Sequence, residues 1–238
     1  MAEHLTVRFT SLTGAPEIPT VMYTVNDRGF PFFSERRRLG HDEIAVRYPG
    51  ESPFALEVLH EVPGFGRVIT TADNAGELYT TASGPIDFRT EAARTKVGRI
   101  GTALRDAETC GYAVSADLRG RVGAASAALA RCLEMSDGEP RRRRLAELLS
   151  RAFWLGEELE LLRASADLDA MDPVARSEKL FGASFFDPDA DETFRYRFEE
   201  IFNFATTPFY RRRVEPREGE VDWETRDRLL KWLDEKAI

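Results

Sequence analysis

The hydrophobic pattern of this 238-residue chain changes its period twice, which divides it into three segments. Over residues 5–105, short apolar runs recur about every 8–12 residues and are separated by turn sequences such as Asn26-Asp27-Arg28-Gly29. The alternation of apolar and polar residues is clearest over 55–62, where every second residue from Leu56 would point to the same face. His60 belongs to that face and is predicted to be a structural histidine. The spacing predicts an all-β sandwich over residues 5–105.

Residues 112–170 have a helical period instead. A break at 136–140 separates two stretches in which apolar residues recur at steps of three and four. This predicts an α-helical hairpin connector. Its apolar stripe either packs within the chain or forms the seam of a homodimer. The second stretch carries the stripe at Leu145, Leu148, Ala152, Leu155, Leu159, Leu162 and Ala166.

Residues 178–238 alternate apolar runs with helical patterns. The first run, 179–186, is typical of a strand buried on both faces, and a second run covers 202–210. The order strand, helix, strand, helix predicts parallel strands covered by helices. The predicted fold class is therefore mixed α and β.

Composition argues against several functional classes. With 33 basic and 41 acidic side chains the net charge is -8, which disfavours a nucleic-acid binder; three short arginine runs are expected to be solvated. Two cysteines and three scattered histidines predict neither a disulfide framework nor a zinc site.

The run Asp187-x-Asp189-x-Asp191 has Glu192 where a calcium loop needs glycine, so it predicts an acidic helix start. No apolar stretch approaches the roughly 20 residues that span a bilayer, and no secretory signal is visible, so no membrane partner and a cytoplasmic location are expected.

The C-terminal segment contains several short motifs in a fixed order. They are Phe181-Gly182-Ala183, the Phe-Asn-x-x-Thr pattern from Phe202 to Thr206, the loop that runs from Glu215-Pro216-Arg217-Glu218-Gly219 to Trp223, and 227–232. Through these motifs the segment resembles the start of the catalytic barrel of family-10 glycoside hydrolases, the endo-β-1,4-xylanases. Through residues 62–68 and 71–77, the preceding region resembles the β-rich, carbohydrate-binding-like module and helical connector of bacterial relatives.

This resemblance implies that residues 178–238 hold the first two βα units of a truncated (β/α) barrel, because a whole barrel takes about 250 residues. The implied activity is hydrolysis of O-glycosidic bonds in a polysaccharide. The family's two catalytic glutamates follow the fourth and seventh strands, beyond this chain. A retaining enzyme needs both carboxyl groups about 5–5.5 Å apart. The chain alone is thus expected to position glycan without catalysing, and no catalytic residue, cofactor or metal is predicted.

Sugar rings stack on exposed aromatic side chains, while amides and charged groups bond their hydroxyls. Phe65 and Tyr79 fit core positions equally well, and Asn203 fits a buried structural role. In the family that the segment resembles, a Glu-Asn pair and a lysine after the second strand bond the sugar. Here Pro208 to Tyr210 stand near the place of the pair and Arg212 stands near that of the lysine, which alters the expected sugar contacts. An alternative function is a non-catalytic carbohydrate-binding or dimerising assembly protein. The predicted glycan-binding residues are Tyr23, Phe65, Asp73, Asn74 and Tyr79 in the β region, and Asn203, Phe209, Tyr210 and Arg212 at the carboxyl end of a C-terminal strand.

Overall fold

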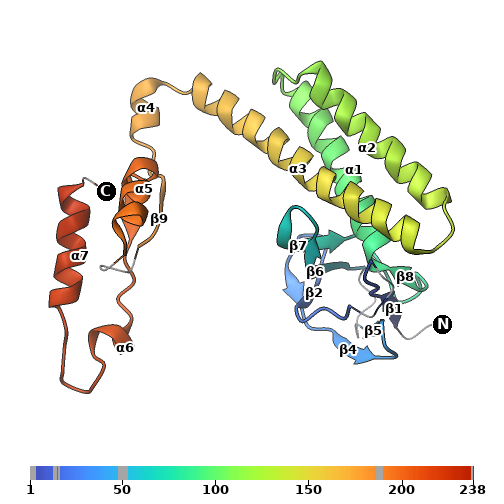
Figure 1. The fold of residues 1–238 in the computed structure, drawn as a ribbon, viewed down its shortest axis with the longest axis horizontal. Coiled ribbons are helices and arrows are strands. Elements are labelled where there is room, and N and C mark those ends of the chain that lie inside the picture. Colours follow the sequence, from blue (N-terminus) through green and yellow to red (C-terminus); the bar gives the residue numbers. More distant parts are fainter. Residues whose placement is uncertain (1–3, 13–14, 16, 48–52, 186–189, 237) are drawn as a thin grey trace. The chain divides into compact units, whose positions relative to one another are not determined.

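The computed structural model describes residues 4–12, 15, 17–47, 53–185, 190–236 and 238. The chain divides into two compact units, Met1–Asp169 and Ala170–Ile238 (Figure 1). Both contain helices and strands, so the predicted mixed α and β class is confirmed. Among the described residues, no helix is both long enough and apolar enough to cross a membrane.

Two four-stranded sheets form the N-terminal part of the first unit. The strand order of one sheet is β4 (Glu35–Arg38), β5 (Glu43–Arg47), β1 (Leu5–Arg8), β8 (Ile86–Asp87). The order of the other is β3 (Pro31–Phe32), β2 (Met22–Val25), β6 (Ala55–Val62), β7 (Gly66–Ala72). All neighbouring strands pair antiparallel except β1 and β8, which pair in parallel.

The alternation predicted for residues 55–62 is present in β6, since Leu56, Val58, His60 and Val62 are buried. Residues of both sheets share one hydrophobic core.

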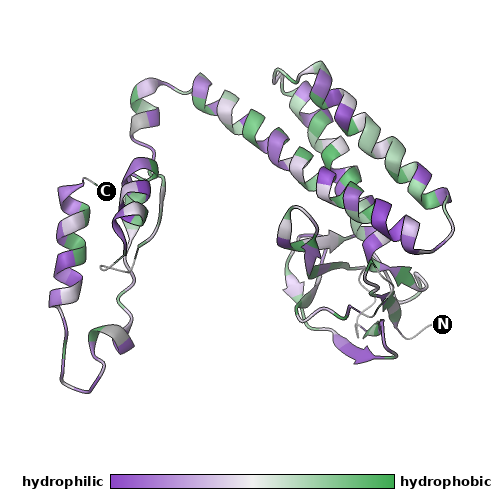
Figure 2. Cartoon of the chain, viewed as in Figure 1, coloured by the Kyte–Doolittle hydropathy of each residue, from purple (hydrophilic) through white to green (hydrophobic). Residues whose placement is uncertain are grey.

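Edge strand β4 contains the first arginine run. All four of its residues are exposed, and Figure 2 shows the strand as uniformly hydrophilic. Charged side chains on an edge strand oppose pairing with other chains. Arg36 donates to the backbone oxygen of Met22, and Arg38 donates to that of Gly40. This run therefore lies on a solvated edge, as predicted.

The strands end at Asp87, so the β-region boundary predicted at residue 105 is wrong. Helix α1 (Phe88–Thr109) begins there, capped by Asp87, whose carboxylate accepts a hydrogen bond from the Thr90 amide at 2.8 Å. Small and polar buried side chains, such as Ala92 and Thr95, obscure the helical period of this segment in the sequence.

Helices α2 (Ala116–Glu134) and α3 (Glu139–Ala170) occupy the segment predicted as a hairpin. They pack with α1 around a second core that contains Leu148, Ala152, Leu155 and Leu159, so most of the predicted stripe lies inside the unit (Figure 1). Phe88 of α1 and Phe153 of α3 also belong to the core of the sheets. The helices and the β region therefore form one compact unit, not a module and a separate connector.

The second unit contains the predicted parallel pair of strands. Strands β9 (Gly182–Ser184) and β10 (Phe204–Thr206) run parallel and are linked by α5 (Glu192–Ile201). The core consists of Phe185, Phe198, Leu229 and Leu233. Asp191 caps α5 as predicted for an acidic helix start, while Asp187 and Asp189 lie outside the described residues. The remaining helices are α4 (Pro173–Ser177), α6 (Arg211–Val214) and α7 (Glu224–Glu235).

The apolar run 179–186 is not buried on both faces, contrary to the prediction. Leu180 and Phe181 are 71% and 61% exposed, and Phe186 lies outside the described residues. The described part of this sheet has only two strands, which leaves each with one neighbour. Gly182 permits the close approach of that neighbour, because a Cβ there would overlap with the carbonyl oxygen of Phe204.

Candidate functional site

The carboxyl ends of β9 and β10 bring two hydroxyl groups together. Ser184 Oγ and Thr206 Oγ1 lie 3.0 Å apart, and both residues are exposed. Ligands of parallel α/β sheets bind at the carboxyl ends of the strands, where the following loops add side chains. The chain that leaves β10 carries the predicted pair Phe209 and Tyr210.

Exposed aromatic rings lie on the chain that follows β10. Phe209 lies 6.4 Å from Trp223, measured between ring centroids, and both rings are open to solvent. Tyr210 is 59% exposed and precedes α6 without making a side-chain capping bond. Flat rings of this kind suit contact with the apolar face of a sugar. We call Ser184, Thr206, Phe209, Tyr210 and Trp223 the aromatic edge.

Sequence reasoning missed three members of the aromatic edge. Ser184 and Thr206 face each other only because of the strand register, which pairs them directly. Trp223 belongs to a loop motif in the sequence, and its approach to Phe209 depends on how that loop closes. Arg212, another predicted glycan-binding residue, is exposed on α6 and has no ion pair with another described residue. Its guanidinium is available to a ligand.

Asn203 does not lie at this edge, so that prediction is wrong. It precedes β10, at the opposite end of the strand. Its Oδ1 accepts a hydrogen bond from the Phe181 amide at 2.7 Å, and its Nδ2 donates to the carbonyl oxygen of Lys179 at 2.8 Å. Both ends of the side-chain amide are therefore used to hold the backbone before β9.

The Glu-Pro-x-x-Gly loop is closed by its own glutamate. Glu215 accepts hydrogen bonds from the Gly219 amide and from Arg211 Nε, both at 2.9 Å. Gly219 has a φ of +80°, which favours glycine. The two donors lower the pKa of Glu215, and hydrogen bonds from Thr225 lower the pKa of Asp222. A glycosidase's general acid needs a raised pKa, so neither carboxyl group has the environment of one.

Two predicted residues of the β region form a structural turn. Asp73 is buried and accepts hydrogen bonds from Thr95 Oγ1 at 2.7 Å and from Arg99 Nη2 at 3.0 Å. Asn74 has a φ of +55°, and its Nδ2 donates to the carbonyl oxygen of Leu78 at 3.1 Å. These contacts join the end of β7 to α1.

Of the other three residues predicted in the β region, Phe65 and Tyr79 pack inside the first unit. Tyr79 is 1% exposed and its hydroxyl donates to Glu91 Oε2 at 2.8 Å; burial raises the pKa of this hydroxyl. Phe65 packs its ring 4.8 Å from that of Phe153. Tyr23 alone among the five has an exposed ring, on β2. The structure therefore does not gather the five into a sugar-binding surface.

His60 has a structural environment, as expected. It is buried, and its ring lies 5.8 Å from that of Phe88. Desolvation by burial, together with the charge of Arg89, lowers its pKa to about 4. Its Nε2 has no hydrogen-bond partner among the described residues. Among all the residues that the structure describes, no group of three or more His, Cys, Asp or Glu side chains is placed to hold a metal ion.

Comparison with protein-family models, curated proteins and solved structures finds no match for this chain.

Proposed function

We propose that the aromatic edge binds a polysaccharide or oligosaccharide, and that the chain takes part in hydrolysis of O-glycosidic bonds, as family-10 glycoside hydrolases do. Its own contribution is glycan positioning. The observation that supports this proposal is a group of exposed aromatic rings on the chain that follows the carboxyl end of β10, one of two parallel strands. Barrel enzymes build their sites at that end.

The chemistry of the aromatic edge suits a sugar. The rings of Tyr210 and Trp223 offer apolar faces to sugar C–H groups. The hydroxyls of Ser184 and Thr206 can donate and accept hydrogen bonds, and Arg212 adds a charged donor. A sugar offers the complementary groups, namely apolar C–H faces for the rings and hydroxyls for the hydrogen-bonding side chains.

The proposal extends to the finer architecture. We propose that β9, α5, β10 and α7 correspond to the first two βα units of a (β/α) barrel, and that the two four-stranded sheets pack as a sandwich. The parallel pairing of β9 with β10 supports the first, and the shared core of the two sheets supports the second. The exposed apolar residues Leu180 and Phe181 would suit burial against further elements of such a barrel.

The alternative, a non-catalytic carbohydrate-binding or dimerising protein, has less support. Four of the five candidates in the β region make internal contacts: Phe65, Asp73, Asn74 and Tyr79. Much of the hairpin stripe that motivated a homodimer is buried against α1. A homodimer through the hairpin stays a prediction.

Calorimetric titration of the full chain with xylohexaose and cellohexaose tests the proposal. Tyr210→Ala should weaken binding about tenfold, since it removes a stacking face. Tyr196→Ala is the matched control, because Tyr196 on α5 is also 59% exposed. Neither change should shift the free energy of unfolding by more than about 0.5 kcal/mol. Equal losses in the two variants, or no saturable binding of either oligosaccharide, would overturn the proposal.

A further inference from the structure

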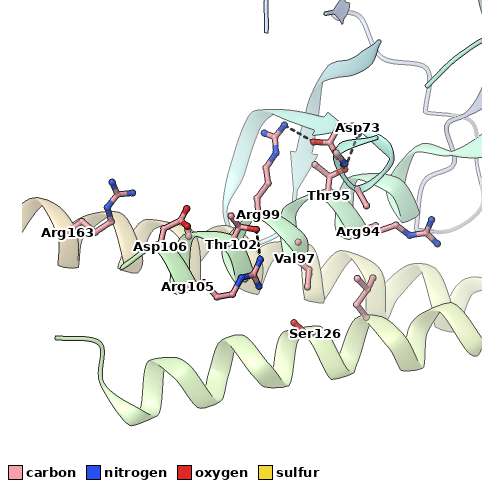
Figure 3. A pocket seen from close by; sticks show the side chains of 16 residues that line it. Asp73, Arg94, Thr95, Val97, Arg99, Thr102, Arg105, Asp106, Ser126 and Arg163 are labelled. Carbon is pink, nitrogen blue, oxygen red and sulfur yellow. Dashed lines mark hydrogen bonds and ion pairs between the residues drawn. The ribbon is translucent and has the colours of Figure 1, made fainter. Parts of the chain in front are cut away.

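A second candidate site lies in the N-terminal unit, in a cleft of about 680 Å³ lined mainly by α1, with further residues from α2, α3 and the 3-10 turn η1 (Asn74–Gly76). The volume is within the range of small-molecule pockets. Figure 3 shows Arg163 of α3 at one end of the view, Arg94 at the other, and Arg99 and Arg105 between them. We call these four residues the arginine cleft.

The residues that line the arginine cleft include more basic than acidic side chains. Four arginines line it against two carboxylates, Asp73 and Asp106, in a chain whose net charge is -8. Asp73 is already engaged, because its oxygens accept hydrogen bonds from Thr95, Gly76 and Arg99. It is therefore a poor counter-ion for the remaining guanidinium groups.

Arg105 is the most available of the four. Arg94 pairs with Glu91 at 3.3 Å, and Arg163 pairs with Glu160 at 3.4 Å. Arg105 donates to the Thr102 hydroxyl at 2.9 Å and forms no ion pair with any residue that the structure describes. In Figure 3 a dashed line joins its guanidinium to Thr102 on the same helix, and Ser126 lies on the neighbouring helix α2.

Two glycines keep the α1 side of the cleft open. Gly98 and Gly101 line it one helical turn apart, and a Cβ placed on Gly98 would meet no atom within 4 Å. Glycine inside a helix lowers helix stability relative to alanine. The space above Gly98 is thus open to a ligand, and a larger side chain there would fill the cleft without a clash at its Cβ.

We infer that the arginine cleft binds a small organic anion that carries a phosphate or carboxylate group. The planar guanidinium fork forms paired hydrogen bonds with both groups. Arg105 supplies a guanidinium group that has no ion pair among the described residues, while Arg94, Arg99 and Arg163 line the cleft with guanidinium groups that each have one carboxylate partner. This inference is independent of the proposed glycan site, which lies in the other unit.

Titration of the full chain with pyrophosphate and with citrate, at constant ionic strength, tests the inference. At least one anion should bind saturably, and their relative affinities distinguish a phosphate ligand from a carboxylate one. Arg105→Gln should raise the Kd about tenfold, because a hydrogen-bonded charge pair is lost. Gly98→Leu should abolish binding by filling the cleft, and it raises helix propensity.

The control is Arg131→Gln, which removes the same charge from α2 outside the cleft. Its Kd should stay within about twofold of the unaltered chain, since distant exposed charges are screened. Three results would overturn the inference: no saturable binding of either anion, unchanged binding by Arg105→Gln, or equal weakening in Arg131→Gln. If Gly98→Leu fails to fold, the two arginine variants decide the question, because both residues are exposed.

Discussion

The buried pair of Tyr79 and Glu91 allows a direct test of the core of the first unit. The Tyr79 hydroxyl donates to the Glu91 carboxylate at 2.8 Å, and both residues are buried. Tyr79→Phe keeps the ring and removes only this hydrogen bond. A bond to a charged group contributes about 1.5–3 kcal/mol. Because Glu91 keeps Arg94 as a partner at 3.3 Å, we expect a loss of about 2 kcal/mol.

For a unit of this size, that loss lowers Tm by about 4–8 °C. Far-UV circular dichroism measures it, since α1, α2 and α3 supply most of the helix. The matched control is Tyr23→Phe, whose ring is exposed on β2 and whose Tm should change by less than about 2 °C.

A double-mutant cycle with Glu91→Gln assigns the effect to the pair, because contacting residues show a coupling energy of about 0.5–3 kcal/mol. Equal Tm values for Tyr79→Phe and Tyr23→Phe would refute the buried bond. Loss of glycan binding in Tyr79→Phe at unchanged stability would return Tyr79 to the list of sugar ligands.

Three further predictions follow from buried or constrained groups. Because burial and Arg89 lower the pKa of His60 from 6.5 to about 4, the unfolded chain binds a proton that the folded chain lacks between these values. Stability in urea should therefore be complete above pH 6.5 and fall by about 3 kcal/mol as the pH drops to 4; a His60→Leu variant with the same slope would contradict this. Gly182→Ala should destabilise the second unit by about 1–3 kcal/mol, because the new methyl group overlaps with the Phe204 carbonyl. Gly120→Ala is the control: its methyl group would lie in open space on α2 and should stabilise that helix. Thermal melts followed by circular dichroism compare the two variants. Amide protons of residues 178–238 should exchange faster than those of β5, β6 and β7, since β9 and β10 each have one neighbour among the described strands, and equal protection by mass spectrometry would count against this.

Elements with regular periods were predictable from the sequence. The alternation of β6 and the helical stripe of α3 each follow from large apolar residues at fixed spacing. The parallel pairing of β9 with β10 follows from the order of the elements, since a strand, helix and strand in sequence favour a right-handed parallel crossover.

Other features depend on contacts that a single sequence does not display. Helix α1 buries Thr90, Glu91 and Thr95, whose side chains form hydrogen bonds with the β region. It also buries Arg89, whose Nη2 bonds Glu17 while its Nε and Nη1 have no partner among the described residues. Asn203 looks like a ligand residue in the sequence until its amide is seen to hold the backbone before β9. The Ser184–Thr206 contact needs the strand register, which periodicity alone leaves open.

The residues that carry the family-10 resemblance divide into two groups. Gly182, Asn203, Glu215 and Gly219 determine the backbone: they permit a close approach, clamp a strand entry and close a loop. Each of the polar atoms of Asn203 and Glu215 described above already makes a hydrogen bond within the chain. Phe209, Tyr210 and Arg212 are instead exposed on the chain that follows β10, where the sequence departs from the pattern of the resemblance. Because the proposed ligand contacts rest on other residues than the backbone geometry does, the proposed fold is compatible with a glycan other than xylan.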